Sequence, residues 1–195
     1  MWNSLRRSQQ DFKPLWRFAT GYAGFVRNPT TSPAALARIR KRLLHRNDSF
    51  LALVKRRIFD YPESPYLPLF RAAGCDFGDV ASMVQAEGLA PTLSRLAAEG
   101  VRVSIDEFKA RIPIQRSQLS LEVDERAFDN PYLAHHLEAQ SGGTRSAGTR
   151  VLVDLDFIAA LADDTAVTFD AHNLWRAKQA LWLPVGGTAL IASRR

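Results

Sequence analysis

The periodicity of the apolar residues changes near residue 110, and this change limits the folds that the chain can adopt. Residues 36–44 and several later segments repeat apolar side chains at the spacing of an amphipathic helix. Beyond residue 110, the segment 119–123 alternates apolar and polar residues, and 151–153 is a short apolar run rich in valine. Both patterns are typical of strands. The sequence therefore predicts an α/β protein with a helical front and a sheet-forming back.

Proline, glycine and capping residues mark where the predicted helices begin and end. Gly74, Gly88 and Gly100 each follow a helical pattern, as expected of a residue that accepts left-handed backbone at a helix end. Ser104 and Glu107 stand three apart, as in a capping box. We expect helices that begin at Ser32-Pro33 and Asn47-Asp48-Ser49, helices over 66–73, 79–87, 91–98, 104–108, 156–161 and 174–183, and strands over 101–103, 119–123, 151–153, 165–169 and 184–192.

These changes in residue pattern divide the chain into three predicted segments. Residues 1–31 form a basic, aromatic arm, residues 32–110 a helical lead-in, and residues 111–195 the start of an α/β domain. The last segment ends in an apolar strand for which the preceding chain offers few neighbours, although a strand needs partners for its backbone groups. We therefore expect the α/β domain to be truncated.

Positive charge is concentrated in the first part of the chain. Residues 1–60 hold thirteen Lys and Arg against three Asp, a balance of +10, whereas the whole chain carries +6, so residues 61–195 carry −4. A basic head of this kind can bind nucleic acid, anionic lipid or the acidic surface of its own protein. Between residues 38 and 46 the cations spread around the predicted helix rather than lying on one face, which favours a solvated helix over a DNA-reading one.

The arm mixes aromatic rings with basic side chains. Its rings are Trp2, Phe12, Trp16, Phe18, Tyr22 and Phe25. Such a mixture can stack on bases or lie at a membrane interface. We favour a third interpretation, in which the rings pack on the rest of the protein.

Other reactive side chains give weak signals. Cys75 has no intrachain partner for a disulfide, and we expect an inert, buried thiol in a cytoplasmic protein. The histidines have no Cys, Asp or Glu at a telling interval, so no metal site is predicted. Asp154, Asp156, Asp163, Asp164 and Asp170 are expected to be helix caps or solvated charges.

One segment, Ser141–Arg150, has a composition that suits an anion. It combines three glycines with several hydroxyl side chains and two arginines, between two predicted strands. Glycine lets consecutive N–H groups turn inward and lets a phosphate approach closely, while arginine can hold two oxygens at once. The spacing matches neither the Walker pattern nor the dinucleotide-binding glycine pattern. A glycine-rich hairpin with exposed arginines is the alternative that composition alone allows.

Three segments in order resemble adenylate-forming enzymes, in the branch of phenylacetate-CoA ligase and the acyl-protein synthetases. They are Ser141–Arg150, which resembles the phosphate loop of that family, Ser64-Pro65-Tyr66 with residues 69–74, and residues 105–114. The resemblance covers residues 48–192 and corresponds to the N-terminal portion of such an enzyme. It implies the large α/β subdomain of the ligase fold, here incomplete.

The resemblance also implies a reaction and its ligands. Family members join a carboxylic acid to ATP with Mg2+, release pyrophosphate, and mostly pass the acyl group to a thiol such as that of coenzyme A. Ser141, Gly142, Gly143, Thr144, Gly148 and Thr149 would hold the β- and γ-phosphates of ATP, and Arg145 or Arg150 would take the place of the usual loop lysine. The later motifs and the C-terminal domain with the catalytic lysine have no counterpart here. We therefore expect the isolated chain to be inactive, and a missing C-terminal portion or a complementing subunit to be its partner.

Two alternatives remain at this point. The chain can be a non-catalytic module that binds nucleic acid or anionic membrane through residues 1–60, or a structural subunit completed by a partner polypeptide. Because the cations of residues 38–46 do not share a face, we do not expect nucleic acid or a membrane to be the main partner.

Overall fold

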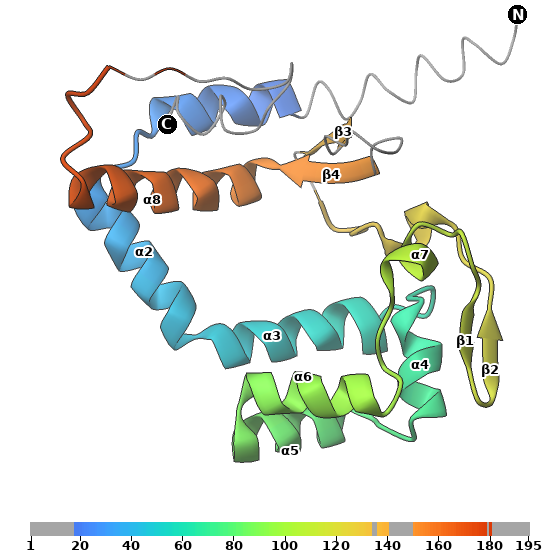
Figure 1. Ribbon diagram of the computed structural model, residues 1–195. Coiled ribbons are helices and arrows are strands. Elements are labelled where there is room, and N and C mark those ends of the chain that lie inside the picture. Colours follow the sequence, from blue (N-terminus) through green and yellow to red (C-terminus); the bar gives the residue numbers. More distant parts are fainter. Residues whose placement is uncertain (1–17, 134–135, 141–149, 179, 181–195) are drawn as a thin grey trace, which may run out of the picture. The chain divides into compact units, whose positions relative to one another are not determined.

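The computed structural model describes residues 18–133, 136–140, 150–178 and 180. Within them the fold is mixed α/β, with helices in the majority and two small antiparallel sheets of two strands each (Figure 1). The chain divides into two compact units. Unit 1 consists of residues 1–42 and 131–195, and unit 2 of residues 43–130. The boundaries predicted between arm, lead-in and α/β region stay predictions.

Unit 2 is a helical body with one small hairpin. Its core contains Val54, Phe70, Val80, Val84 and Leu96. The elements are α3 (Arg46–Val54) with its π-helical continuation η1 (Lys55–Phe59), α4 (Tyr66–Ala72), α5 (Phe77–Glu87), α6 (Leu89–Ala98), α7 (Ile105–Phe108), the antiparallel strands β1 (Ile114–Arg116) and β2 (Leu119–Leu121), and the 3-10 helix η2 (Glu125–Phe128).

The helix ends in unit 2 follow the local signals in the sequence. Gly74, Gly88 and Gly100 have φ of 63°, 83° and 92° and stand just beyond α4, α5 and α6, so the predicted glycine stops are confirmed. Ser104 and Glu107 form the predicted capping box of α7.

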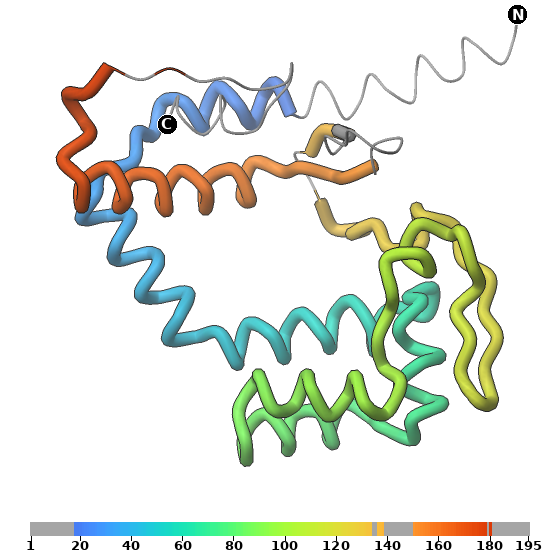
Figure 2. The backbone as a smooth tube through the Cα atoms, in the orientation of Figure 1, coloured from blue at the N-terminus to red at the C-terminus, as the bar shows by residue number. Residues whose placement is uncertain are grey.

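Unit 1 contains both the first and the last of the described residues. Residues 18–27 are helical and are followed by α2 (Ser32–Leu44), whose last two residues belong to unit 2. From the other end come β3 (His136–Gln140), β4 (Arg150–Asp154) and the long helix α8 (Leu155–Ala171). β4 runs directly into α8 (Figure 2).

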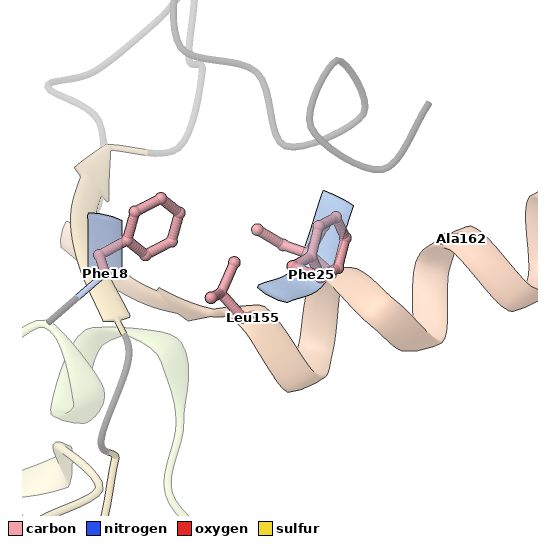
Figure 3. Close-up of a cluster of buried hydrophobic side chains, with 5 residues drawn as sticks. Phe18, Phe25, Leu155 and Ala162 are labelled. Carbon is pink, nitrogen blue, oxygen red and sulfur yellow. The ribbon is translucent and has the colours of Figure 1, made fainter. Parts of the chain in front are cut away.

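The core of unit 1 joins the arm to α8. Phe18 and Phe25 are buried together with Leu155, Ile158 and Ala162 (Figure 3). The side chains of α8 in this core recur at helical spacing, which explains why its apolar face turns toward residues 18–27. For these residues, the interpretation of an arm that packs on its own protein is confirmed.

The predicted strand at 101–103 is wrong. Its residues lie in an irregular segment, and the Arg116 side chain takes up the backbone oxygens there: Nε donates to the carbonyl of Gly100 at 2.8 Å, and Nη2 donates to that of Arg102. Because these oxygens already have a donor, the segment needs no neighbouring strand.

Three further expectations about helices and strands are wrong. Residues 165–169 belong to α8 rather than to a strand, and Ala166 lies on its buried face. α3 begins at Arg46, with no side-chain cap, instead of at Asn47. Residues 174–178 are not helical. The predicted strand at 184–192 lies outside the described residues.

Candidate functional site

The candidate phosphate segment connects the two strands of the hairpin in unit 1. Of its residues, Ser141, Gly142, Gly143, Thr144, Arg145, Gly148 and Thr149 lie outside the described part of the chain. The flanking strands β3 and β4 are antiparallel, with Gln140 opposite Arg150 and His136 opposite Asp154. Because Gln140 and Arg150 are cross-strand partners, residues 141–149 begin and end at neighbouring backbone positions, about 5 Å apart.

Arg150 is the one predicted site residue that the structure describes. Its Nε lies 2.7 Å from Oε2 of Glu138, and its side chain is 11% exposed while that of Glu138 is 53% exposed. Glu138 stands on β3 diagonally across from Arg150, two positions before the residue that pairs with it. An anion bound by this guanidinium therefore competes with a carboxylate of the same hairpin.

Strand β4 lies between Arg150 and the N-terminus of α8. Its five residues span about 16 Å at the rise of an extended strand. The first turn of α8 is occupied by Asp154, whose Oδ1 accepts a hydrogen bond of 2.6 Å from the backbone N–H of Phe157. The predicted capping role is confirmed for Asp154.

A second polar cluster, which the sequence did not reveal, lies in unit 1. Asp163 of α8 is 1% exposed, although acidic residues of this stretch were expected to be caps or solvated charges. Nε and Nη2 of Arg38 donate to its carboxylate at 3.0 and 2.6 Å, and Nη1 of Arg42 donates at 2.9 Å. Arg42 also lies 3.7 Å from the exposed Asp164. The expectation is therefore wrong for Asp163, and we call these four residues the Asp163 cluster.

Charge balance explains how a carboxylate can be buried there. Burial disfavours the charged form of Asp163, but the hydrogen bonds from Arg38 and Arg42 outweigh it and lower the pKa of the carboxyl. The same bond from the other side raises the pKa of Arg38. Asp163 is thus an anion that neutralises part of the basic head, residues 1–60. The charge of this head allowed nucleic acid, anionic lipid or an acidic group of the protein itself as partner, and Asp163 is such an acidic group.

A third polar cluster holds unit 2 together. Glu107 accepts a 2.7 Å bond from Nη1 of Arg116 and another of 2.7 Å from the backbone N–H of Ser104. The hydrogen bond from Arg116 is the main reason that the pKa of Glu107 falls to about 2. The sequence showed the capping box but not Arg116, which comes from the neighbouring strand β1.

Cys75 shows no sign of activation. Its side chain packs beside the core of unit 2, and burial, followed by the carboxylates of Asp79, Glu99 and Asp76, raises the pKa of the thiol. A thiol with a raised pKa stays protonated at neutral pH and is a poor nucleophile. This agrees with the expected inert thiol.

The described residues contain neither a group of metal ligands nor a membrane-spanning helix. In the part of the chain that the structure describes, no three His, Cys, Asp or Glu side chains are grouped so that they could hold a metal ion. No helix formed by those residues has the length and apolar character needed to cross a membrane. Comparison of the chain with protein-family models, curated proteins and solved structures finds no match.

Proposed function

We propose that this chain is the N-terminal part of an ATP-dependent ligase that activates a carboxylic acid as an acyl-adenylate and then transfers it to a thiol, coenzyme A being a possible acceptor. The observation that supports it is the Ser/Gly/Thr/Arg segment 141–150, which connects two paired strands and follows two further segments in the order seen in adenylate-forming enzymes. In this proposal the segment binds the β- and γ-phosphates of ATP.

The chemistry requires a group that stabilises the departing pyrophosphate. A carboxylate oxygen attacks the α-phosphorus, the new P–O bond gives the acyl-adenylate, and the bond to the β-phosphate oxygen breaks with its electrons on pyrophosphate. Backbone N–H groups and arginines stabilise that developing charge most when they are already oriented. Magnesium bound to the phosphate oxygens of ATP would supply further positive charge.

Arg150 has a defined part in this scheme. Its charge is balanced by Glu138. A polyphosphate carries more negative charge than one carboxylate and offers paired oxygens to a guanidinium, so it can replace Glu138 as the partner of Arg150. We expect Arg150→Gln to weaken ATP binding about tenfold.

Calorimetric titration of the whole chain with ATP and Mg2+, and separately with pyrophosphate, tests the proposal. We expect both to bind, and Gly143→Val to abolish the binding because the added side chain blocks the approach of phosphate. Gly24→Val is the matched control, since Gly24 is exposed in the helical segment 18–27 and a Cβ there meets no heavy atom within 4 Å. Absence of binding in the wild type, or equal affinity in Gly143→Val, refutes the role of the segment.

Exchange of labelled pyrophosphate into ATP tests the second half of the proposal. We expect no carboxylate-dependent exchange by the chain alone, because the family's catalytic lysine has no counterpart in it. Robust exchange would show that the chain is a complete catalyst and would overturn its assignment as a part of one.

A further inference from the structure

Helix α2 has two different sides, and the Asp163 cluster defines the first of them. Ala35, Arg38 and Arg42 recur at i, i+3 and i+7 and so share one side of the helix. Ala35 is 0% exposed, and both arginines bind Asp163 of α8. This side of α2 is therefore committed to unit 1.

The opposite side is exposed and mixes leucine with positive charge. Leu36, Arg40, Leu43 and Leu44 recur at i, i+4, i+7 and i+8, and Lys41 lies beside them. The three leucines are 36%, 61% and 81% exposed, and both cations are exposed. We call these five residues the outer face of α2. Exposed leucines in this number on one short helix are unusual unless another surface covers them.

The charge around this face has one sign. Residues 27–47 contain six Lys and Arg and no Asp or Glu. Asp163 holds Arg38 and Arg42, which leaves Arg27, Arg40, Lys41 and Arg46 as the cations of the stretch that it does not bind. The complementary surface must therefore be anionic and must also accept apolar side chains.

We propose that the outer face of α2 docks on an anionic lipid bilayer, with the leucines in the boundary between headgroups and acyl chains and the cations among the phosphates. Both features belong to helices that lie in the plane of a membrane interface, and the long stem of Arg40 lets its charge reach the headgroups while its carbons lie beside the leucines. Nucleic acid offers the phosphates but nothing that buries leucine. The proposal is independent of nucleotide binding.

This inference departs from the expectation that a membrane is not the main partner. The sequence showed cations on all sides of the helix, without a preferred face. The structure divides the cations of α2, because Asp163 binds Arg38 and Arg42 on one side and leaves Arg40 and Lys41 with the exposed leucines.

Sedimentation of the full chain with sucrose-loaded vesicles tests the proposal. We expect binding to vesicles of phosphatidylcholine mixed with phosphatidylglycerol, no binding to phosphatidylcholine alone, and loss of binding in high salt. Arg40→Gln with Lys41→Gln should lower the partition coefficient about 30-fold, from roughly fivefold per cation. Leu43→Gln with Leu44→Gln should lower it about tenfold or more, since the leucines no longer leave water. Glutamine keeps the helix propensity in both variants.

Matched substitutions elsewhere separate this face from the general charge and apolarity of the protein. Arg71→Gln with Arg102→Gln removes two exposed cations of unit 2, and Leu53→Gln with Leu93→Gln removes two leucines that are 46% and 47% exposed. Both controls should bind like the wild type, and circular dichroism should show equal helix content in all variants.

Several outcomes overturn the proposal. Failure of the wild type to sediment with anionic vesicles, equal binding to neutral vesicles, or equal losses in the control variants each excludes this face as a bilayer-docking surface. If the chain binds heparin but not vesicles, and the leucine variant keeps that binding, the face recognises a polyanion instead.

Discussion

Asp163→Asn should destabilise unit 1 far more than the same change at the adjacent Asp164. The carboxylate of Asp163 is 2% exposed and accepts bonds of 2.6 to 3.1 Å from two arginines, whereas Asp164 is 65% exposed and lies 3.7 Å from Arg42. Removing one partner of a buried ion pair costs about 3–5 kcal/mol. The arginine side chains here are 41% and 45% exposed and can regain water, so we reduce the expected loss to about 2 kcal/mol. For Asp164→Asn we expect about 0.5 kcal/mol or less.

Tryptophan fluorescence during urea unfolding measures this loss in unit 1 alone. Trp175 packs against Phe169 of α8 in unit 1, and the sequence has no tryptophan in residues 43–130. The midpoint should fall in Asp163→Asn with little change in the slope, and should stay close to the wild type in Asp164→Asn. Equal midpoints for the two variants would refute the assigned role of the Asp163 cluster.

The pH dependence provides a second check on the same reasoning. The pKa of Asp163 is lower in the folded protein than its ordinary value of 3.8. A depressed carboxyl pKa stabilises the fold above the unfolded-state pKa and loses that contribution as the pH falls through the folded-state pKa. The difference between wild type and Asp163→Asn should therefore be constant from neutral pH down to about 4 and shrink only below it. A difference that already shrinks between neutral pH and pH 5 would contradict this account.

Two further predictions concern unit 2. Glu107→Gln should destabilise it by about 2 kcal/mol, because Arg116 keeps its carbonyl acceptors but loses the buried carboxylate. The folded-state pKa of Glu107 is about 2, against an ordinary value of 4.5, so its contribution to stability should be present above about pH 4.5 and disappear as the pH falls through about 2. Urea unfolding followed by circular dichroism at several pH values measures this contribution. An unchanged wild-type stability across that pH window would contradict it. Cys75 should react with iodoacetamide more slowly than free cysteine at pH 8, because its thiol pKa is raised by burial and by the neighbouring carboxylates. A rate equal to that of free cysteine in the folded protein would contradict the raised pKa.

The parts of the fold that the sequence predicted are those set by short-range interactions. The ends of α4, α5 and α6 depend on single glycines with positive φ, and the start of α7 depends on Ser104 and Glu107, three residues apart. In each case the groups that satisfy the backbone lie within one helical turn, so the pattern of residues is enough to locate them.

The failed predictions share the opposite cause. The segment 101–103 alternates like a strand, but the backbone oxygens of Arg102 and of the preceding Gly100 accept hydrogen bonds from the side chain of Arg116, which lies more than ten residues further along the chain. Residues 165–169 have strand-forming side chains, but burial of Ala166 on the face of α8 keeps them helical. Both threonines there donate to the carbonyl four residues earlier, as helical threonines do. Packing decided these segments against their local preference.

For the candidate site, the sequence identified the residue types and their neighbours in the chain. It placed the glycine-rich segment between strands predicted at 119–123 and 151–153. The second of these lies within β4, whereas β3, the strand that precedes the segment and pairs with β4, was not predicted. The sequence did not identify Glu138 as the partner of Arg150, because cross-strand pairing depends on the register of the hairpin rather than on the distance along the chain.

The sequence by itself therefore determined the helical front, the ends of α4, α5 and α6, the start of α7 and the chemical character of the segment 141–150. Only the tertiary structure decided which charges of the basic head are neutralised, since Arg38 and Arg42 meet Asp163 across 125 and 121 residues of chain. Coulombic attraction between groups so distant in sequence acts only after the chain has brought them to within a few ångströms. The spacing of residues along the chain does not show which distant groups meet. A helical turn joins residues three or four apart, so that spacing is enough to predict it.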